Sequence, residues 1–416
     1  MKEKEDKKQN VPKRRFPGFT EPWEQRRLKD ISKRIQGNDG RMDLPTLTIS
    51  AGNGWMRQED RFSANIAGNE QKNYSLLKKG DLSYNHGNSK LAKYGAVFEL
   101  TDYSEALVPR VYHSFRMIKG SSVFIDYLFK TGRPNSELRK LISSGARMDG
   151  LLNISYEDFN NITLFIPDED EQFNIGAFFR QLDSLITLHQ RKLDDLKLLK
   201  KGLLQKMFPK NGEKIPEIRF PGFTDDWEQR RFKELVLIER GGSPRPIQDY
   251  IIDNDEEGIN WVKIGDAPEF GNRIEKTSEK IKKSGLPKTR QVFPGDLILS
   301  NSMSFGKPYI MGISGCIHDG WLLIRDSNKI FDQQFLCQLL GTDQMIDQYV
   351  SLAAGSTVNN LNKDLVGSTF VTYPSLAEQK TVSLFFKKFD TLITLHQRKL
   401  DNLKLLKKGL LQEMFV

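Results

Sequence analysis

The decapeptide LITLHQRKLD occurs twice in this chain, at 185–194 and again at 392–401. The similarity extends over residues 180–208 and 387–415, which match at 23 of 29 positions. Further upstream, FPGFTEPWEQRRLKD (16–30) matches FPGFTDDWEQRRFKE (220–234) at 11 of 15 positions. Matches in the same order at a nearly constant offset indicate an internal duplication. The sequence therefore predicts two tandem units of about 205 residues each.

The duplicated stretch that closes each unit has the pattern of a long amphipathic helix. Its apolar residues recur every three or four positions and no proline interrupts it. A helix of 29 residues is about 44 Å long, and two such narrow stripes favour an antiparallel coiled coil. The predicted seam residues are Leu182, Ile186, His189, Leu193, Leu196, Leu199, Leu203 and Met207 in the first copy, and Phe389, Ile393, His396, Leu400, Leu403, Leu406, Leu410 and Met414 in the second.

Two features of these helices have alternative explanations. His189 and His396 lie on the stripe, where a tolerated or hydrogen-bonded seam residue is favoured over a ligand role. The lysine-rich face around KLLKK is favoured as a solvated face, with contact to a partner or to a DNA backbone as the alternative. We expect Trp23 and Trp227, which hold the same repeat position, to anchor the packing of each unit.

The segments between the repeats, 31–165 and 235–372, are rich in Gly, Asn and Ser and in short β-branched runs. GAVFEL, NITLFIP, INWVKIGD, GDLILS and GSTFVTYP predict short strands, and helices are expected near 122–130 and 333–350. These segments have diverged while the helices stayed alike. An identical surface shown twice suggests two copies of one partner, and two different domains suggest two different targets.

The predicted fold is α+β, with two strand-rich α/β domains separated and held by two long antiparallel coiled-coil helices in a pseudo-two-fold tandem repeat. The expected boundaries are a disordered basic tail at 1–14, a first domain at 15–167, a central helix at 168–209, a second domain at 210–374 and a C-terminal helix at 375–416.

The positive charge of the chain is local. The formal net charge is +9, yet residues 1–15, 180–208 and 387–415 each carry a net +4, which leaves about −3 for the rest. Any DNA contact must therefore use local charge or charge supplied by a partner. No apolar run approaches a membrane span, the N-terminus lacks the apolar core of a secretory signal, and there are only two cysteines. We expect a cytoplasmic protein without a membrane segment.

An ordered set of motifs resembles the specificity subunit of type I restriction–modification enzymes. Each half opens with FPGFT and a nearby Trp and closes with the LITLHQRKLD…LKLLKKGLLQ helix. The second half adds GGSPRP (241–246), NWVKIGD (260–266), PGDLILSNSMSFGKP (294–308) and AAGSTVNNLN (353–362). The resemblance covers nearly the whole chain from about residue 14. The first half departs from it, with GDLSYNHGNS (80–89) and SSGARMDG (143–150), so its contact residues are less defined.

The resemblance implies a non-catalytic subunit that binds double-stranded DNA. Each globular domain would be a target-recognition domain reading one half of a bipartite sequence. The helices would fix the unread gap and dock two methyltransferase subunits, and two restriction subunits would complete the complex. No cofactor and no metal site are implied. The chain has no Pro-Pro, so the family's adenine-methylating Asn/Asp-Pro-Pro-aromatic loop is absent.

The geometry of base reading agrees with this resemblance, because amide, hydroxyl and basic side chains on loops suit the edges of bases in the major groove. The predicted DNA contacts in the second domain are Ser243, Arg245, Lys263, Asn301, Ser302, Ser304, Lys307, Asn359, Asn360 and Lys363. Those in the first domain are Asn53, Trp55, Arg57, Asn85, His86, Asn88, Lys90 and Arg147. Gly, Ser and Asn are also ordinary turn residues, and Trp55 would equally suit a core or lid position.

Two other functional classes are weighed against this prediction. One is a scaffold whose domains bind proteins rather than DNA, and the other is a self-contained nuclease or methyltransferase. The sequence contains no GxxxxGK[ST] cradle, no HExxH pair and no complete GxGxxG fingerprint, which disfavours the enzyme. Cys316 and His318 form an isolated pair without further zinc ligands nearby in the sequence.

Overall fold

The computed structural model describes residues 10–62, 68–87, 90–142, 152–210, 212–252, 257–268, 271–301, 305–354 and 361–416. Contacts divide the chain into a first unit, Met1–Leu188 with Leu400–Val416, and a second unit, His189–Lys399. Two long helices, α7 (Glu169–Met207) and α11 (Leu376–Glu413), each contribute one segment to each unit. In the ranges described, no helix combines the length and apolar character needed to cross a bilayer.

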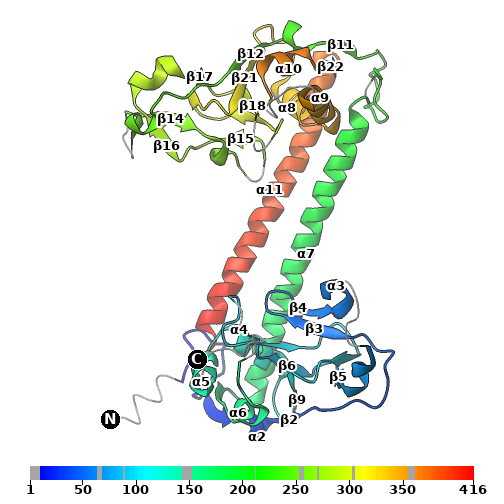
Figure 1. Ribbon diagram of the computed structural model, residues 1–416, viewed down its shortest axis with the longest axis vertical. Coiled ribbons are helices and arrows are strands. Elements are labelled where there is room, and N and C mark those ends of the chain that lie inside the picture. Colours follow the sequence, from blue (N-terminus) through cyan, green and yellow to red (C-terminus); the bar gives the residue numbers. More distant parts are fainter. Residues whose placement is uncertain are drawn as a thin grey trace. The chain divides into compact units, whose positions relative to one another are not determined.

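The first unit contains a four-stranded sheet and three two-stranded ones (Figure 1, blue to cyan). The four-stranded sheet has the order β2 (Ser32–Arg34), β9 (His113–Met117), β6 (Leu82–Asn85), β7 (Ala96–Glu99). The pairs are β1 (Glu24–Arg27) with β10 (Thr163–Ile166), β3 (Leu47–Ser50) with β4 (Gly54–Arg57), and β5 (Ser75–Lys78) with β8 (Glu105–Val108). The helices are α2 (Leu28–Ile31), α3 (Gln58–Phe62), α4 (Ser122–Lys130), α5 (Asn135–Leu141) and α6 (Tyr156–Asn160).

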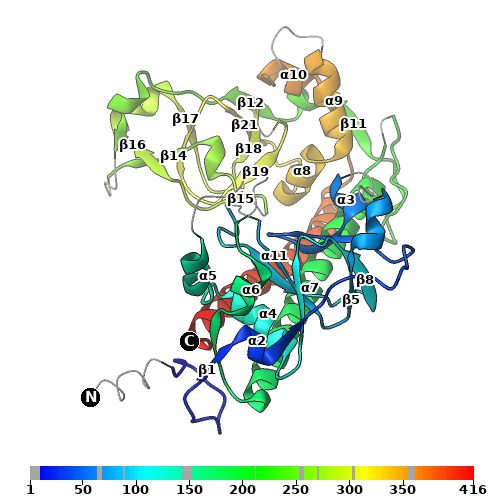
Figure 2. The same cartoon turned by 60° about the horizontal axis from the view of Figure 1, so that its bottom comes forward.

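The second unit has a different sheet arrangement. One five-stranded sheet has the order β12 (Leu237–Arg240), β21 (Trp321–Arg325), β18 (Leu297–Ser300), β19 (Pro308–Met311), β15 (Arg273–Ile274). The other has the order β13 (Ile251–Ile252), β16 (Glu279–Ile281), β14 (Ile259–Val262), β20 (Gly315–Ile317), β17 (Arg290–Val292). Three helices, α8 (Gln333–Leu340), α9 (Asp343–Ala354) and α10 (Lys363–Ser368), lie beside one another (Figure 2), and β11 (Glu228–Arg231) pairs with β22 (Phe370–Tyr373).

The FPGFT…W repeat has the same structural role in both units. The strand that follows it reads EQRR in each unit and pairs antiparallel with the last strand before a long helix. Arg15 bonds Glu171 of α7 at 2.7 Å, and Arg219 bonds Glu378 of α11 at 2.7 Å. Both glutamates are almost fully buried. We call residues 15–27 and 219–231 the duplicated arm. Through these contacts the arm fixes the position of each domain on the long helix that follows it.

The end of each long helix packs into the core of the domain that the other helix follows. Phe208, just after α7, contacts Trp227 and Phe335 at ring-centroid distances of 5.9 and 5.3 Å. Phe415, just after α11, contacts Trp23 and Phe124 at 6.0 and 5.3 Å. Phe208 and Phe415 hold the same repeat position. Trp23 and Trp227 are buried, so the predicted anchoring role is confirmed.

The two long helices pair antiparallel within each unit. In the second unit Lys200 bonds Asp390 at 2.5 Å, and in the first Lys407 bonds Asp183 at 2.5 Å. These two ion pairs join the same two repeat positions, as a pseudo-two-fold repeat requires. His189 and His396 hydrogen-bond each other through their Nδ1 atoms at 3.2 Å. The hydrogen-bonded seam histidine predicted from the sequence is confirmed.

Most of the predicted seam residues are buried or half-buried, and two are exposed. The residues that are buried or half-buried are Leu182, Ile186, His189, Leu193, Leu196, Leu203, Phe389, Ile393, His396, Leu400, Leu403 and Leu410. Leu199 and Leu406, however, are 53% and 50% exposed. The seam prediction was wrong at these two positions, because Lys200 and Lys407, one residue later, reach across the interface with their charged ends.

The α+β class with two strand-rich domains and two long helices is confirmed. Each of the five predicted strand segments contains a strand, and α4 occupies the helix expected near 122–130. The single helix expected near 333–350 is two helices. The first ends at Leu340, before Gly341, and the Thr342 hydroxyl accepts a hydrogen bond from the Met345 amide at the start of the second. The finer domain boundaries remain a prediction.

Candidate nucleic-acid interface

Three predicted contact residues of the second domain, from separate segments, meet around the turn between β20 and β21. The carboxylate of Asp319 accepts hydrogen bonds from the Ser243 hydroxyl at 2.9 Å and from the Arg245 guanidinium at 3.4 Å. The Asn301 amide donates to the Asp319 carbonyl at 2.8 Å. We call Ser243, Arg245, Asn301, His318 and Asp319 the Asp319 cluster.

The electrostatics of the Asp319 cluster favour an ionised carboxylate. Burial alone would raise the pKa of Asp319. The hydrogen bond from Ser243 and the neighbouring His318 and Arg245 together outweigh burial, so the pKa of Asp319 lies below its ordinary value. The Arg245 side chain is 81% exposed, so its guanidinium is held at one edge and open to a ligand on the other. This cluster can present a positioned arginine and a hydroxyl to a base edge or a phosphate.

Asn301 has an internal role instead. It is 4% exposed, and its backbone bonds Gly320 and Leu361 while its amide bonds Asp319. Asn301 therefore positions the turn, and its burial does not favour direct base contact. Asp319 and His318 were missed by the sequence reasoning; the turn motif His-Asp-Gly at 318–320 was the available signal.

The remaining candidates of the second domain are dispersed. Lys263 forms an ion pair with Glu279, which leaves it less available than a free lysine. Lys363 is exposed at the start of α10, and Lys307 is exposed and lines a groove beside α7. Ser302, Ser304, Asn359 and Asn360 lie outside the described residues.

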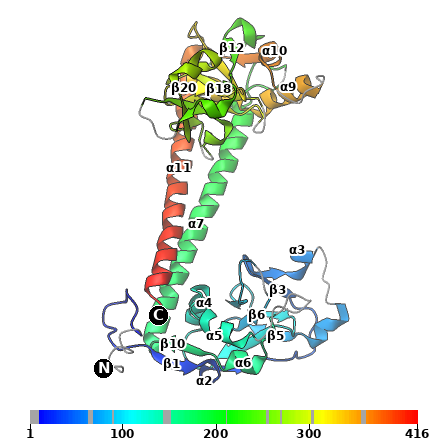
Figure 3. The ribbon, with the colours of Figure 1, turned by 60° about the vertical axis from the view of Figure 1, so that its left-hand side comes forward.

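In the first domain the hairpin of β3 and β4 holds three of the eight predicted residues (β3 is labelled in Figure 3). Asn53 and Arg57 are exposed, and Arg57 pairs with Glu59 at 2.5 Å. Trp55 is half-buried and its indole N–H donates to the Glu99 carbonyl at 3.0 Å, so it serves as a partly covered anchor of the hairpin.

The second group of candidates in the first domain follows β6. The Asn85 amide donates to the Ile49 carbonyl at 3.2 Å, and Lys90 is exposed. His86 is 7% exposed, with its ring nitrogens 2.8 and 2.9 Å from the Leu152 and Val111 carbonyls. This placement gives His86 a role in the core and does not favour DNA contact. Asn88 and Arg147 lie outside the described residues.

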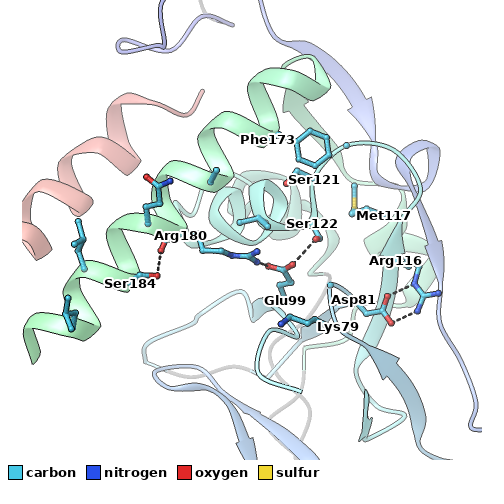
Figure 4. A pocket seen from close by; sticks show the side chains of 17 residues that line it. Lys79, Asp81, Glu99, Arg116, Met117, Ser121, Ser122, Phe173, Arg180 and Ser184 are labelled. Atoms are coloured by element: carbon cyan, nitrogen blue, oxygen red, sulfur yellow. Dashed lines mark hydrogen bonds and ion pairs between the residues drawn. The ribbon is translucent and has the colours of Figure 1, made fainter. Parts of the chain in front are cut away.

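A groove of about 990 Å³ runs between α7 and the body of the first domain (Figure 4). Glu99 at its floor accepts bonds from Arg180 at 2.6 Å and Ser122 at 2.9 Å. At one side Arg116 bonds Asp81 at 2.6 Å. Apart from these ion pairs and Lys79, the lining is largely apolar and includes Phe173, Leu185 and Leu188. Such a groove suits apolar side chains better than phosphates.

The long helices also carry exposed leucines at matching repeat positions. These leucines are 43–73% exposed: Leu185, Leu188, Leu198 and Leu199 in α7, and Leu392, Leu395, Leu405 and Leu406 in α11. Scattered single leucines are common on surfaces, but four that recur identically in two copies form a repeated apolar surface. We call these eight residues the outer leucines.

Among the described residues, no group of three or more His, Cys, Asp and Glu forms a metal-binding cluster. Cys316 and Cys337 are buried and form no disulfide, and burial raises the pKa of Cys337 to about 12. Neither thiol is therefore presented as a ligand or nucleophile.

Residues 224–405 match the model of a domain family described as type I restriction modification DNA specificity domain. The chain is 25% identical over 298 residues to the type I restriction enzyme MjaVIII specificity subunit of Methanocaldococcus jannaschii, covering 68% of each chain. It is 22% identical over 425 residues to the putative MjaX specificity subunit of the same organism, covering 97% of this chain and 95% of that one.

Two solved structures share the fold over nearly the full length. One, from a study of complex assembly and conformational transition of the type I R-M system, has a TM-score of 0.56 at 17% identity, covering 97% of this chain and 99% of that one. The other, the S subunit of a type I restriction–modification system from M. genitalium, has a TM-score of 0.56 at 14% identity, covering 98% and 99%. At these identities the structures establish a likeness of fold.

Proposed function

The chain belongs to the specificity-subunit family of type I restriction–modification enzymes, and on this premise we propose that each globular domain reads one half of a bipartite DNA sequence. As a specificity subunit it is non-catalytic, and the methyltransferase and restriction subunits supply the chemistry. The observation that carries the proposal is the combination of two unlike domains with two alike helices. The first domain has one four-stranded sheet and the second has two five-stranded sheets, yet both are joined to their helix by the same arm.

The unlike domains suit the reading of unlike half-sites. In the second domain the Asp319 cluster offers Arg245 and Ser243, and in the first the β3–β4 hairpin offers Asn53 and Arg57. Arginine and asparagine are the side chains that most often make paired hydrogen bonds to guanine and adenine in the major groove. Each domain therefore has an exposed set of groups able to discriminate bases.

The alike helices suit the binding of two copies of one partner. The outer leucines recur at the same positions in α7 and α11, so a protein that covers one set can cover the other in the same manner. We assign these surfaces to two methyltransferase subunits, with two restriction subunits joining the same complex. The apolar groove of the first unit begins at Leu185 and Leu188 and extends this surface.

The test is a binding and methylation assay of the chain with its methyltransferase partner on a library of random duplexes. The expected result is a split consensus, with two specific half-sites separated by an unread gap of fixed length. Exchange of the second domain for that of a related subunit should change one half-site and leave the other. A library that yields no consensus, or one continuous site, contradicts the proposal and would favour a protein-binding scaffold.

A further inference from the structure

A second groove, of about 620 Å³, lies in the second unit between α7 and the second domain. Five lysines line it: Lys197, Lys200, Lys201 and Lys210 from α7 and the turn after it, and Lys307 from the domain. Two aspartates also line it, which leaves a net charge of +3. Lys210 also forms an ion pair with Glu217, which lies outside the lining. The groove still differs from that of the first unit, whose lining carries three basic and two acidic side chains.

Its acidic groups already have partners inside the groove. Asp390 bonds Lys200 at 2.5 Å, and Asp343 accepts a bond from the Gln205 amide at 2.7 Å. Lys201 is 3.9 Å from Asp343 and its side chain is 65% exposed. Lys307 is exposed, with its ammonium 5.9 Å from the Tyr309 ring centroid. The ammonium groups of Lys201 and Lys307 can therefore both reach an anion in the groove.

One residue of the groove and one residue of the Asp319 cluster lie on the same hairpin of β18 and β19. Lys307 is anchored to the end of β18, where its amide donates to the Ser300 hydroxyl at 3.1 Å and its carbonyl accepts from the Ser300 amide at 3.0 Å. The next residue, Asn301, bonds the backbone of Asp319. The same hairpin thus links the Asp319 cluster to the lysines beside α7.

Leu199, one of the outer leucines, lies on the face of α7 opposite two of the groove lysines, whereas Leu198 lies about 60° from Lys201. Leu199 is two positions from both Lys197 and Lys201, which is about 200° around the helix. A subunit that covers Leu199 would leave the groove accessible on the opposite face of α7.

We propose that this groove binds phosphates of the DNA duplex at the border between the half-site of the second domain and the unread gap. The inference rests on the proposed function and adds a sequence-independent grip to it. Its chemistry is that of a phosphodiester backbone, because the groove presents ammonium groups, which recognise charge rather than sequence. The amides of its two glutamines, Gln205 and Gln344, already donate to Asp343 and to the Phe208 carbonyl. Through this contact α7 would hold gap DNA as well as set its length.

The test uses the assembled complex of the chain with its methyltransferase partner and compares Lys201→Gln, Lys307→Gln and the double variant. The control is Lys388→Gln on the exposed surface of α11, where the other repeat naturally has Gln181. Affinity is measured for the cognate duplex and for an unrelated duplex of equal length, at several salt concentrations. Each groove variant should weaken both duplexes about equally, roughly 3- to 10-fold, and reduce the salt slope by about 0.9 per lysine lost. The control should match the wild type.

Methylphosphonate linkages supply the matching change in the DNA. Neutral linkages at the gap-proximal phosphates beside the second half-site should weaken wild-type binding and have little further effect on the double variant. An unchanged salt slope in the variants overturns the inference, and so does a loss of methyltransferase association in place of DNA affinity. If the wild type itself shows no split consensus, the proposed function fails; an intact consensus with an unchanged slope removes only the phosphate groove.

Discussion

At the scale of single residues, the identities retained in the repeat mark positions that make the same contact twice. Phe208 and Phe415 each fill a pocket lined by a buried tryptophan, and each lies at the end of a long helix. Histidines outside the repeat make different contacts from those inside it. His189 and His396 bond each other in the seam, whereas His86 and His113 stack in the first domain at 4.7 Å between ring centroids.

The matched phenylalanines give a prediction about which unit loses stability. Phe415→Ala should lower the free energy of unfolding of the first unit by about 3–5 kcal/mol, because a large buried aromatic leaves a cavity among aromatic neighbours. Phe208→Ala should do the same to the second unit. Hydrogen exchange followed by peptide mass spectrometry would locate each effect. Equal loss of protection in both units for either variant would contradict this assignment.

His113 predicts that the first domain weakens in mild acid. Burial lowers the pKa of His113 to about 4, against a hydrogen bond from its ring to the Ile154 carbonyl, with His86 and Arg34 nearby. Because the folded-state pKa lies below the ordinary 6.5, the unfolded chain binds more protons. The contribution of His113 is therefore complete above about pH 6.5 and is lost as the pH falls towards 4.

Denaturant unfolding, monitored by hydrogen exchange at pH values between 7.5 and 4, checks this pH dependence. His113→Phe, which cannot titrate, should flatten part of the fall in the stability of the first domain. A wild-type profile that is flat across this range, or one that His113→Phe leaves unchanged in slope, would count against it.

At the scale of secondary-structure elements, the sequence predicted what depends on local periodicity. The long helices and the strands within the five β-branched runs follow from spacing alone. The exposure of Leu199 did not, because it depends on how the partner helix packs, and Lys200, one residue later, bonds Asp390 of that helix. The Asp319 cluster was predicted only in part, since Ser243 and Asn301 meet through a sheet pairing that no local pattern encodes.

The helices also give a prediction about the unread gap. Four residues inserted within 196–203, together with a matched insertion within 403–410, add about 6 Å of helix, which is about 2 base pairs of DNA. Both insertions are needed because Lys200 and Lys407 hold the two helices in register. Methylation of duplexes that differ only in gap length should shift to the longer gap with both half-sites unchanged. Methylation retained at the original gap would show that the helices do not set it.

At the scale of the whole molecule, the core of each domain includes the end of the long helix that follows the other domain in the sequence. The end of α7 completes the core of the second domain, and the end of α11 completes the core of the first. The segment before the first domain also contacts the end of α11, because Arg14 pairs with Glu413 at 2.9 Å. Each domain therefore depends on a helix end that the sequence places in the other repeat or at the far end of the chain.

Because each domain core includes the helix end of the other repeat, we predict that one repeat alone can form both contacts by pairing with a second copy of itself. A fragment of residues 1–209 has the Trp23 pocket but lacks Phe415, and it carries the equivalent Phe208 on an exposed helix end. Two fragments should pair antiparallel, with each Phe208 filling the Trp23 pocket of the other, because residues 180–208 and 387–415 match at 23 of 29 positions. Analytical ultracentrifugation should show a dimer, and Phe208→Ala should dissociate it. With the methyltransferase partner the dimer should read two inverted copies of the first half-site. A fragment that stays monomeric, or a dimer that Phe208→Ala leaves intact, would mean that the repeats are not interchangeable at this contact.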